Sequence, residues 1–292
     1  MSGMSLCALV IEYRSPRLTV SCVHALLSHG LEHVHVVDNS DDEGETSRVL
    51  SQVFEDDPRV VMHDAGANLG FAAGVNLGLR KIGADRVLLI NNDAVPDERA
   101  VSSLRAALDE DGSVCIAYPS LMHAGCALRR IFYHRWLAVL SGIHWKGSFE
   151  VPRGCCMLVA LDRLPPGPLF DERFFMYGEE IELGWRLQQM GLRMRHVEHA
   201  WVQHIGSATS VRGSAFYEER TALAHLLLGA VLKKGSAADG PLLVVRCAMI
   251  FMRAVSRCMA QRSLLPMRSL AKAKRLLSTQ EVAGSPPHRL RK

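Results

Sequence analysis

Apolar runs and amphipathic segments alternate along the first 112 residues of this 292-residue chain. The runs typical of buried strands cover residues 5–13, 33–40, 60–64 and 85–93. The segments between them repeat apolar positions every three or four residues, as amphipathic helices do. The helices predicted in this way cover residues 17–30, 46–57, 68–83 and 97–112. Strands and helices that alternate at this length predict an α/β fold with a mostly parallel sheet covered on both faces.

The pattern is less regular after residue 112. It predicts a strand over 154–161, a helix that begins after Gly178, and a strand pair within 192–207 that ends at His204. From residue 216 the chain has helical spacing, and its end has the composition of a disordered tail. We expect three parts: a sheet domain over 1–215, a helical extension over 216–279, and a disordered tail over 280–292.

The composition indicates a protein that is made and kept in the cytoplasm. The first 13 residues lack the basic start, long apolar run and cleavage site of a secretory signal. None of the eight cysteines forms a CxxC pair, and the neighbours Cys155 and Cys156 cannot both bind one zinc ion from consecutive strand positions. We therefore expect reduced cysteines that pack as small apolar residues.

The net charge of +4 is divided unevenly along the chain. From residue 233 onward there are 13 Lys or Arg and only two acids, Asp239 and Glu281, whereas the first 232 residues hold 21 basic and 28 acidic residues. The basic end is therefore the part expected to seek a partner. Nucleic acid is not the expected partner, because aromatic residues are not interleaved with these charges.

The segment 241–261 is apolar apart from three arginines, Arg246, Arg253 and Arg257, which make a membrane span costly. Offsets of seven and eleven residues place these arginines on one helical stripe. The pattern fits a helix lying in a membrane surface. It fits equally an amphipathic helix packed on the sheet domain or at a homodimer contact.

Two predicted strands end in polar residues, at Asp38 and at Asn91, Asn92 and Asp93. Ligands of such sheets bind beyond the carboxyl ends of the strands. An ordinary polar turn explains the Asn-Asn-Asp triplet. A divalent cation site explains it as well, because Mg²⁺ and Mn²⁺ take oxygen ligands and need only one or two carboxylates beside substrate phosphates. His204 is a further ligand candidate if the fold brings it near Asp93.

Gly70, Gly74 and Gly78 are spaced four residues apart on one helical face. Close packing of the helix on the sheet explains Gly74 and Gly78. Asn68 and Gly70 precede the helix in a turn whose backbone donors suit a diphosphate or a ribose. The spacing is neither that of a dinucleotide-binding fingerprint nor that of a phosphate-binding Walker loop.

Glu179 and Glu180 open the helix that follows Gly178. Acids in the first helical turn complement the helix dipole, and Glu182 stands four residues before Arg186 as a supporting ion pair. A structural role at a helix start is thus the simplest interpretation of the acidic pair. Its functional interpretation depends on the other motifs.

Taken in order, five segments resemble the family 2 inverting glycosyltransferases of the GT-A fold, and among them the rhamnosyltransferase-like members. The segments, which fall within residues 5–225, are VVDNS, NLGFAAGVNLG, LLINNDA, LFDERFFMYGEEIELGWRL and HIGS. The resemblance implies transfer of a sugar, most specifically L-rhamnose from dTDP-rhamnose, onto a cell-surface polysaccharide or lipopolysaccharide precursor. A glycan or lipid-linked glycan would be the acceptor, at the cytoplasmic face of a membrane.

The resemblance also assigns roles to residues. Asp38 would contact the nucleotide base, Asn68 and Gly70 would lie near the ribose and diphosphate, and Asn92 would belong to the same nucleotide-sugar site. Asp93 with His204 would hold Mg²⁺ or Mn²⁺. Glu180 would be the catalytic base, and Glu179 would orient the acceptor or support the loop.

The chain departs from the family pattern at two points. The second acid of the pair is Glu where relatives often have Asp, and the metal triplet is Asn-Asn-Asp where many have two aspartates. Three alternatives remain open: a UDP-hexose or UDP-N-acetylhexosamine transferase, a non-catalytic binder of nucleotide sugars, and a nucleotidyltransferase, for which no basic triphosphate loop follows the first strand.

Overall fold

The computed structural model describes residues 5–205, 213–235 and 237–282. The chain divides into two compact units. The first comprises residues 1–134 and 139–209, and the second comprises residues 135–138 and 210–292.

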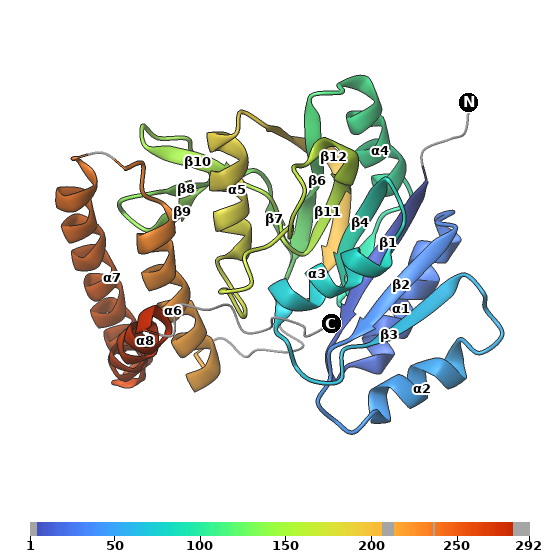
Figure 1. Cartoon of the computed structure of the whole chain (residues 1–292), viewed down its shortest axis with the longest axis horizontal. Coiled ribbons are helices and arrows are strands. Elements are labelled where there is room, and N and C mark those ends of the chain that lie inside the picture. Colours follow the sequence, from blue (N-terminus) through green and yellow to red (C-terminus); the bar gives the residue numbers. More distant parts are fainter. Residues whose placement is uncertain (1–4, 206–212, 236, 283–292) are drawn as a thin grey trace. The chain divides into compact units, whose positions relative to one another are not determined.

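The first unit is built on one large sheet (Figure 1). The strands of this sheet in the described part of the chain are β1 (Leu6–Glu12), β2 (His33–Asp38), β3 (Val60–Asp64), β4 (Arg86–Asn91), β5 (Ala94–Pro96), β6 (Val114–His123), β7 (Cys126–Leu128), β11 (Cys156–Ala160) and β12 (Arg193–His204). Their order is β3-β2-β1-β4-β11-β6-β12-β5, with β7 paired to β6. Strands β1 to β4 are parallel, and β11 runs antiparallel between β4 and β6.

A small antiparallel sheet, ordered β10-β8-β9, adds to this unit. Its strands are β8 (Ile131–His134), β9 (Val139–Ser141) and β10 (Ser148–Val151). The short strands β7 to β10 fall in the region where the sequence pattern is irregular. They are too brief to show a clear apolar period.

Helices cover both faces of the large sheet. Their bounds are α1 (Pro16–Ser28), α2 (Glu45–Val53), α3 (Phe71–Lys81), α4 (Ala100–Glu110) and α5 (Glu179–Gln189), with a 3-10 turn η1 (Leu161–Arg163). One apolar core joins the sheet to α1, α2 and α4, and a second joins its other face to α3 and α5. The predicted α/β fold with a mostly parallel sheet is therefore confirmed.

The predicted strand pair within 192–207 is wrong. Arg193–His204 is one strand, β12, and it runs parallel to β6. Its register against β6 shifts between Val197 and Trp201, so three residues bulge out of the ladder and the apolar alternation breaks there. Gly206 and Ser207 of the HIGS motif lie outside the described residues.

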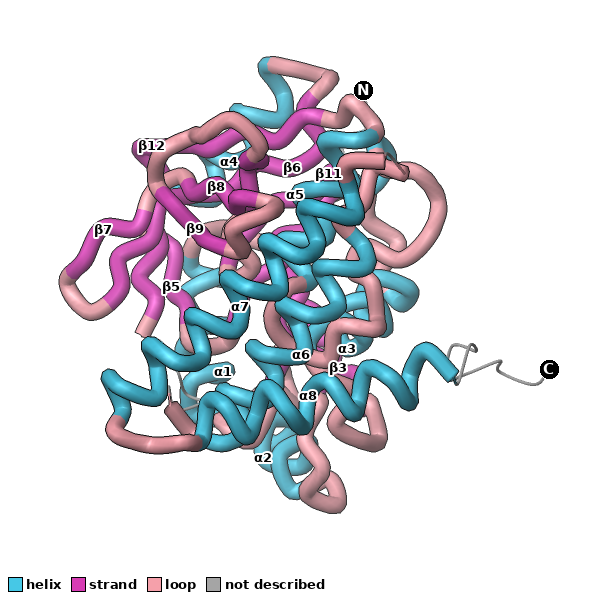
Figure 2. Tube along the Cα trace, turned by 90° about the vertical axis from the view of Figure 1, so that its left-hand side faces the viewer, coloured by secondary structure: helices cyan, strands magenta, loops and turns pink. Residues whose placement is uncertain are grey.

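Three helices make up most of the second unit: α6 (Ala215–Val231), α7 (Asp239–Gln261) and α8 (Leu265–Val282). Figure 2 shows α7 as a long continuous helix, joined by a short turn to α8. No helix in the described ranges combines the length and apolarity that a bilayer crossing requires. All but the first three residues of the tail predicted over 280–292 fall outside the described residues.

The arginine stripe of α7 packs against α6 and residues 135–138, with Arg246 buried and Arg253 exposed. Arg246 is buried and donates to the carbonyl oxygens of Arg135 and His225, at 2.6 and 2.9 Å. Arg253 donates to the carbonyl oxygen of Ala138 at 3.0 Å and lies 2.9 Å from the Nε2 atom of His225. Burial, and then the charge of Arg253, lowers the pKa of His225 to about 3, so the ring is neutral and accepts this hydrogen bond.

Arg257 completes the stripe through a two-point ion pair with Glu218 of α6. All three arginines of the stripe therefore have hydrogen-bond or ion-pair partners within the second unit. A guanidinium has five donors, and backbone carbonyls and a carboxylate of the same unit satisfy them.

The glycines of α3 pack differently from one another. A Cβ atom on Gly78 would lie 2.5 Å from Leu9 Cδ1 and 3.0 Å from Val37 Cγ2, so the helix rests directly on β1 and β2 there. A Cβ atom on Gly74 would lie 3.5 Å from the side chain of Asn39, an ordinary contact. The close packing expected of both glycines is thus a requirement only at Gly78.

Gly78→Ala should lower the free energy of unfolding by about 1–3 kcal/mol, because the added methyl displaces Leu9 in a filled core. The matched substitution Gly74→Ala should be neutral or stabilising by up to about 1 kcal/mol, because alanine is the better helix former and its methyl fits. Denaturant unfolding of both variants measures the difference. Equal effects at the two positions would contradict this account of the packing.

Candidate active site

The carboxyl ends of β4 and β12 bring Asp93 and His204 together. His204 pairs with Ala94 across β12 and β5, and the backbone N–H of Ile205 donates to the carbonyl oxygen of Asp93 at 2.9 Å. The Nε2 atom of His204 lies 3.2 Å from Asp93 Oδ1. Asp93 is nearly buried and His204 is partly exposed. The proximity that a shared cation requires is therefore present.

The potential metal ligands around Asp93 fit a hard divalent cation whose other coordination positions are filled by a substrate. One carboxylate and one imidazole meet there, and the buried Oδ1 atom of Asn91, at the end of β4, has no hydrogen-bond partner in the described part of the chain. The same part holds no group of three or more His, Cys, Asp or Glu arranged for a metal ion. Two protein ligands suit Mg²⁺ or Mn²⁺ when phosphate oxygens complete the shell.

The side-chain nitrogen of Asn92 is hydrogen-bonded to other side chains of the protein. Its Nδ2 atom donates to Glu12 Oε2 at 2.8 Å and to Thr19 Oγ1 at 3.1 Å, and all three side chains are buried. Burial raises the pKa of Glu12, and hydrogen bonds from Thr19, Ser15 and Asn92 oppose this rise. These hydrogen bonds tie the turn that carries Asp93 to β1 and α1 through the side-chain nitrogen of Asn92.

Asp38 is also engaged by its own loop. Its Oδ1 atom accepts from the backbone N–H of Ser40 at 2.9 Å, and its Oδ2 atom accepts from Ser47 Oγ at 2.5 Å. The side chain is buried at the end of β2. Each carboxylate oxygen keeps a second lone pair, which is what a base-contacting role would use.

Asn68 and Gly70 form a tight turn before α3, held by Asn39. The Oδ1 atom of Asn68 accepts from the N–H of Gly70 at 3.0 Å, and Asn39 Nδ2 donates to the carbonyl oxygen of Gly70 at 3.1 Å. Gly70 has a φ of +80°, and a Cβ atom there would collide with the carbonyl oxygen of Phe175. The N–H of Phe71 donates to this same oxygen at 2.7 Å. The turn therefore lies directly against the loop that leads to the acidic pair.

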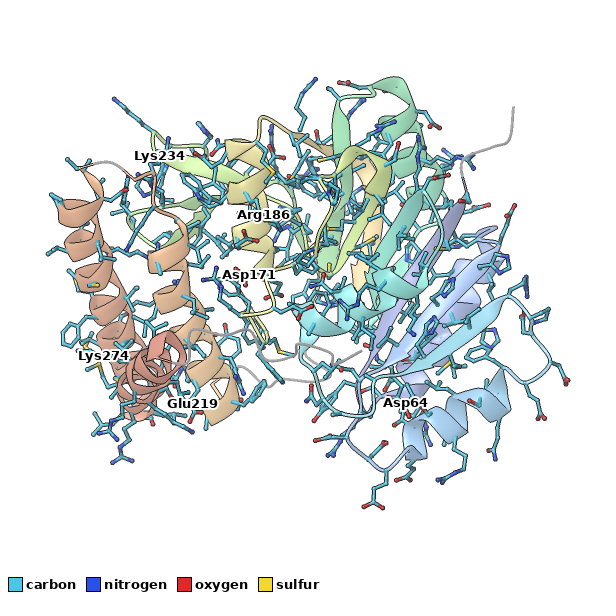
Figure 3. The ribbon with its side chains drawn as sticks, viewed as in Figure 1. Asp64, Asp171, Arg186, Glu219, Lys234 and Lys274 are labelled. Carbon is cyan, nitrogen blue, oxygen red and sulfur yellow. The ribbon has the colours of Figure 1, made fainter. Side chains whose placement is uncertain are left out.

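Asn76 of α3 makes the second attachment of that loop. Its Nδ2 atom donates to the carbonyl oxygen of Phe170 at 2.8 Å, and its Oδ1 atom accepts from the N–H of Phe170 at 3.1 Å. On the other side, Arg186, labelled on α5 in Figure 3, is a hydrogen-bond donor. It donates to the carbonyl oxygen of Leu169 at 2.5 Å. The loop 169–178 is thus held by hydrogen bonds to both α3 and α5.

The acidic pair begins α5 as predicted, with Gly178 as its N-cap. Tyr177 and Gly178 both have positive φ, +69° and +95°, which turns the chain sharply into the helix. The predicted ion pair between Glu182 and Arg186 is present at 2.9 Å. Phe174 is buried, whereas Phe175, Met176 and Tyr177 are partly exposed.

Glu179 and Glu180 stand in different environments. Glu179 is buried, and its burial, followed by the charge of Glu180, raises its pKa well above the usual range. The protonated Glu179 can donate a hydrogen bond to Glu180, a contact that raises the pKa of Glu179 further. Glu180 is partly exposed. The environment therefore favours the protonated form of Glu179, while Glu180 is the more exposed acid, although its Oε2 atom is buried.

The segment Arg153–Cys155 connects Glu180 to Asp93. A Cβ atom on Gly154 would lie 3.5 Å from Glu180 Oε1, so this carboxylate rests over a bare backbone. Burial raises the pKa of the Cys155 thiol to about 12, Arg153 opposes the rise, and the charges of Asp93 and Glu180 add to it. The N–H of Asn91 donates to the carbonyl oxygen of Cys155 at 2.9 Å, so the segment beside Glu180 also borders the strand end that leads to Asp93.

Some of these residues could have been found from sequence and some could not. Glu12 is a charged residue inside an apolar strand, and Asn39 follows Asp38 in the same motif. Both could therefore have been recognised as candidate site residues from the sequence. Asn76 and Gly154 could not, because their partners lie 94 residues away in Phe170 and 26 residues away in Glu180.

The protonated Glu179 predicts a specific dependence of stability on pH. Its folded pKa is above its unfolded value, so its contribution is fully present below the unfolded pKa and is lost as pH rises toward the folded pKa. Glu179→Gln keeps the shape and the hydrogen bond without the titration. The variant should therefore gain stability over the wild type as pH rises above the unfolded pKa of Glu179. Thermal unfolding at several pH values measures this, and parallel curves would contradict it.

The sequence matches a known family and curated relatives. Residues 8–150 match the model of the family described as Glycosyl transferase family 2. An N-acetylglucosaminyl-diphospho-decaprenol L-rhamnosyltransferase from two strains of Mycobacterium tuberculosis is 28% identical over 198 residues. The match covers 56% of this chain and 64% of the length of those relatives.

Solved structures with low sequence identity share the fold. GalNAc-T7 with UDP, GalNAc and Mn²⁺ has a TM-score of 0.60 at 12% identity, covering 78% of this chain and 48% of that one. The mannosyltransferase PcManGT from Pyrobaculum calidifontis, in complex with GDP-Man and Mn²⁺, has a TM-score of 0.57 at 16% identity, covering 97% and 77%. Residues 8–150 therefore resemble the family 2 glycosyltransferases, and the chain has the GT-A fold.

Proposed function

We propose that this chain is an inverting glycosyltransferase that moves L-rhamnose from dTDP-rhamnose onto a lipid-linked glycan, as a step toward a cell-surface polysaccharide or lipopolysaccharide. The observation that carries the reaction type is the position of Glu180, partly exposed over Gly154 in the same site as Asp93. The choice of sugar rests on the relatives named for L-rhamnosyl transfer.

Glu180 is the proposed base. An acceptor hydroxyl attacks the anomeric carbon of the donor sugar, the bond from that carbon to the diphosphate oxygen breaks, and the hydroxyl proton passes to Glu180. A single displacement of this kind inverts the anomeric centre. Glu179 keeps its own proton because it is buried, and it holds the Glu180 carboxylate in place by donating to it. The first turn of α5 further favours negative charge at Glu180.

The donor would occupy the edge formed by β2, β4 and the turn before α3. Asp38 would meet the base, and the turn of Asn68 and Gly70 would lie beside the ribose and diphosphate. Asp93 and His204 would hold Mg²⁺ or Mn²⁺, which when bound stabilises the negative charge that grows on the departing diphosphate. Asn92, through Glu12, keeps the Asp93 turn in position.

A UDP-hexose or UDP-N-acetylhexosamine donor is the second candidate. Structures with the same fold contain UDP with GalNAc, or GDP-Man, so the fold accepts other nucleotide sugars. A non-catalytic binding role is less well supported, because the site keeps an acidic pair with divided environments beside Asp93 and His204. We place the reaction in the cytoplasm, at the membrane face where a lipid-linked acceptor is found.

Thermal unfolding with candidate donors tests the proposal. The donors are dTDP-rhamnose, UDP-glucose, UDP-galactose and UDP-N-acetylglucosamine, each with Mg²⁺, Mn²⁺ or EDTA. A donor present at about 100 times its Kd should stabilise the protein by about 2.7 kcal/mol. We expect this with dTDP-rhamnose and a divalent cation, and its loss in EDTA and in Asp93→Ala. The matched control, Asp162→Ala, removes an exposed carboxylate from η1 and should keep the response.

Three outcomes separate the alternatives. A response to a UDP-sugar alone would select the second candidate. A full response in Asp93→Ala would contradict the cation site while leaving donor binding in place. Stabilisation by none of these donors would contradict the proposed donor class.

A further inference from the structure

The polarity of α7 is inverted relative to an ordinary surface helix. Its three arginines lie against α6 and residues 135–138, while large apolar side chains are exposed on the opposite side. The most exposed are Val244 at 70%, Phe251 at 52%, Met252 at 61% and Met259 at 69%. With 3.6 residues per turn, these positions and Ala248 and Val255 form one stripe along the helix. We call these six residues the outer face of α7.

The contacts of the three arginines fix the rotation of the helix. Arg246 and Arg253 donate to backbone carbonyl oxygens, and Arg257 pairs with Glu218. Turning the helix to hide the outer face would break these bonds and leave buried acceptors unsatisfied. The exposure of the outer face is therefore built into the packing of the second unit. Contiguous exposed apolar surface of this kind marks a binding surface.

The charges around the outer face indicate what covers it. No charged residue stands among its six positions, whereas exposed basic residues precede and follow the helix: Lys233, Lys234, Arg262, Arg268 and Lys274. Figure 3 shows Lys234 ahead of the start of α7 and Lys274 on α8. From residue 233 onward the chain has 13 basic residues against two acids. An apolar stripe between basic ends is complementary to an anionic lipid surface.

We propose that the outer face of α7 inserts into the interfacial layer of an anionic membrane, with the flanking lysines and arginines on the lipid phosphates. A second copy of the chain fits this face less well, because two strongly basic units would repel each other. The proposal extends the proposed function, since an enzyme held at the bilayer surface meets a lipid-linked acceptor in two dimensions. It concerns the surface opposite to the arginine stripe.

Vesicle cosedimentation of the full chain tests the proposal. The vesicles contain phosphatidylcholine alone or phosphatidylcholine with phosphatidylglycerol. Wild type should bind the anionic vesicles, less so the neutral ones, and less again at high salt, because the basic flanks act through a screened field. The double variant Phe251→Gln, Met252→Gln should bind the anionic vesicles at least about tenfold more weakly, because two large apolar side chains no longer enter the lipid.

A matched control is Ile143→Gln, which changes an exposed apolar residue of the first unit and should leave vesicle binding unchanged. Thermal unfolding with the preferred donor is measured on the same samples. The double variant should keep the donor response, which shows that it is folded. A wild type that binds vesicles but no donor would contradict the proposed function while supporting this inference.

Two results would overturn the inference. One is wild-type binding to anionic vesicles that is absent or equal to that of the double variant. The other is a wild-type dimer in sedimentation velocity that the double variant loses, without vesicle binding by either. The second result would mean that another copy of the chain covers the outer face of α7.

Discussion

Burial of a carboxyl group beside another carboxylate favours its protonated form unless a cation lies close by. The site of this protein depends on that constraint. Glu179 is buried against Glu180, so the pair divides into a protonated acid and a partly exposed partner. A single exposed glutamate could take many rotamers at a helix start. The buried neighbour gives Glu180 a hydrogen-bond donor, and the backbone of Gly154 lies beside its carboxylate.

The acidic pair can act on a bound donor only because the loop before it, residues 169–178, is fixed against α3. Asn76 holds Phe170 from α3, and the turn at Gly70 has no side chain, which lets its backbone approach Phe175. Both attachments belong to the same helix whose N-terminal turn is the proposed diphosphate site. Donor site and acidic pair are therefore parts of one packed arrangement, and a change in either would move the other.

The sequence was sufficient for the fold because the strands and helices of the first half have clear and different apolar periods. It was also sufficient for the proximity of Asp93 and His204, but only through a family resemblance, since no local pattern links residues 111 positions apart. Asn92 shows the limit. An Asn at a strand end looks like a ligand, yet Glu12 and Thr19, from a different strand and helix, engage it.

Helix α7 shows a second limit of sequence patterns. Spacing alone placed Arg246, Arg253 and Arg257 on one stripe of α7, and that was right. Spacing could not say which side of the helix faces inward, because the carbonyl oxygens of Arg135 and Ala138, which fix it, lie more than 100 residues earlier. A long guanidinium satisfied by backbone carbonyls packs as well as an apolar side chain does.

The central claim is that Glu180 is the base and Glu179 its protonated support. Turnover of Glu180→Gln and Glu179→Gln with the preferred donor and acceptor, compared at equal donor saturation, tests it most directly. The account predicts that Glu180→Gln lowers kcat by about 10²–10⁴-fold with donor binding retained, while Glu179→Gln keeps most of the turnover. A Glu179→Gln variant that loses as much turnover as Glu180→Gln, or a Glu180→Gln variant that stays active, would contradict it.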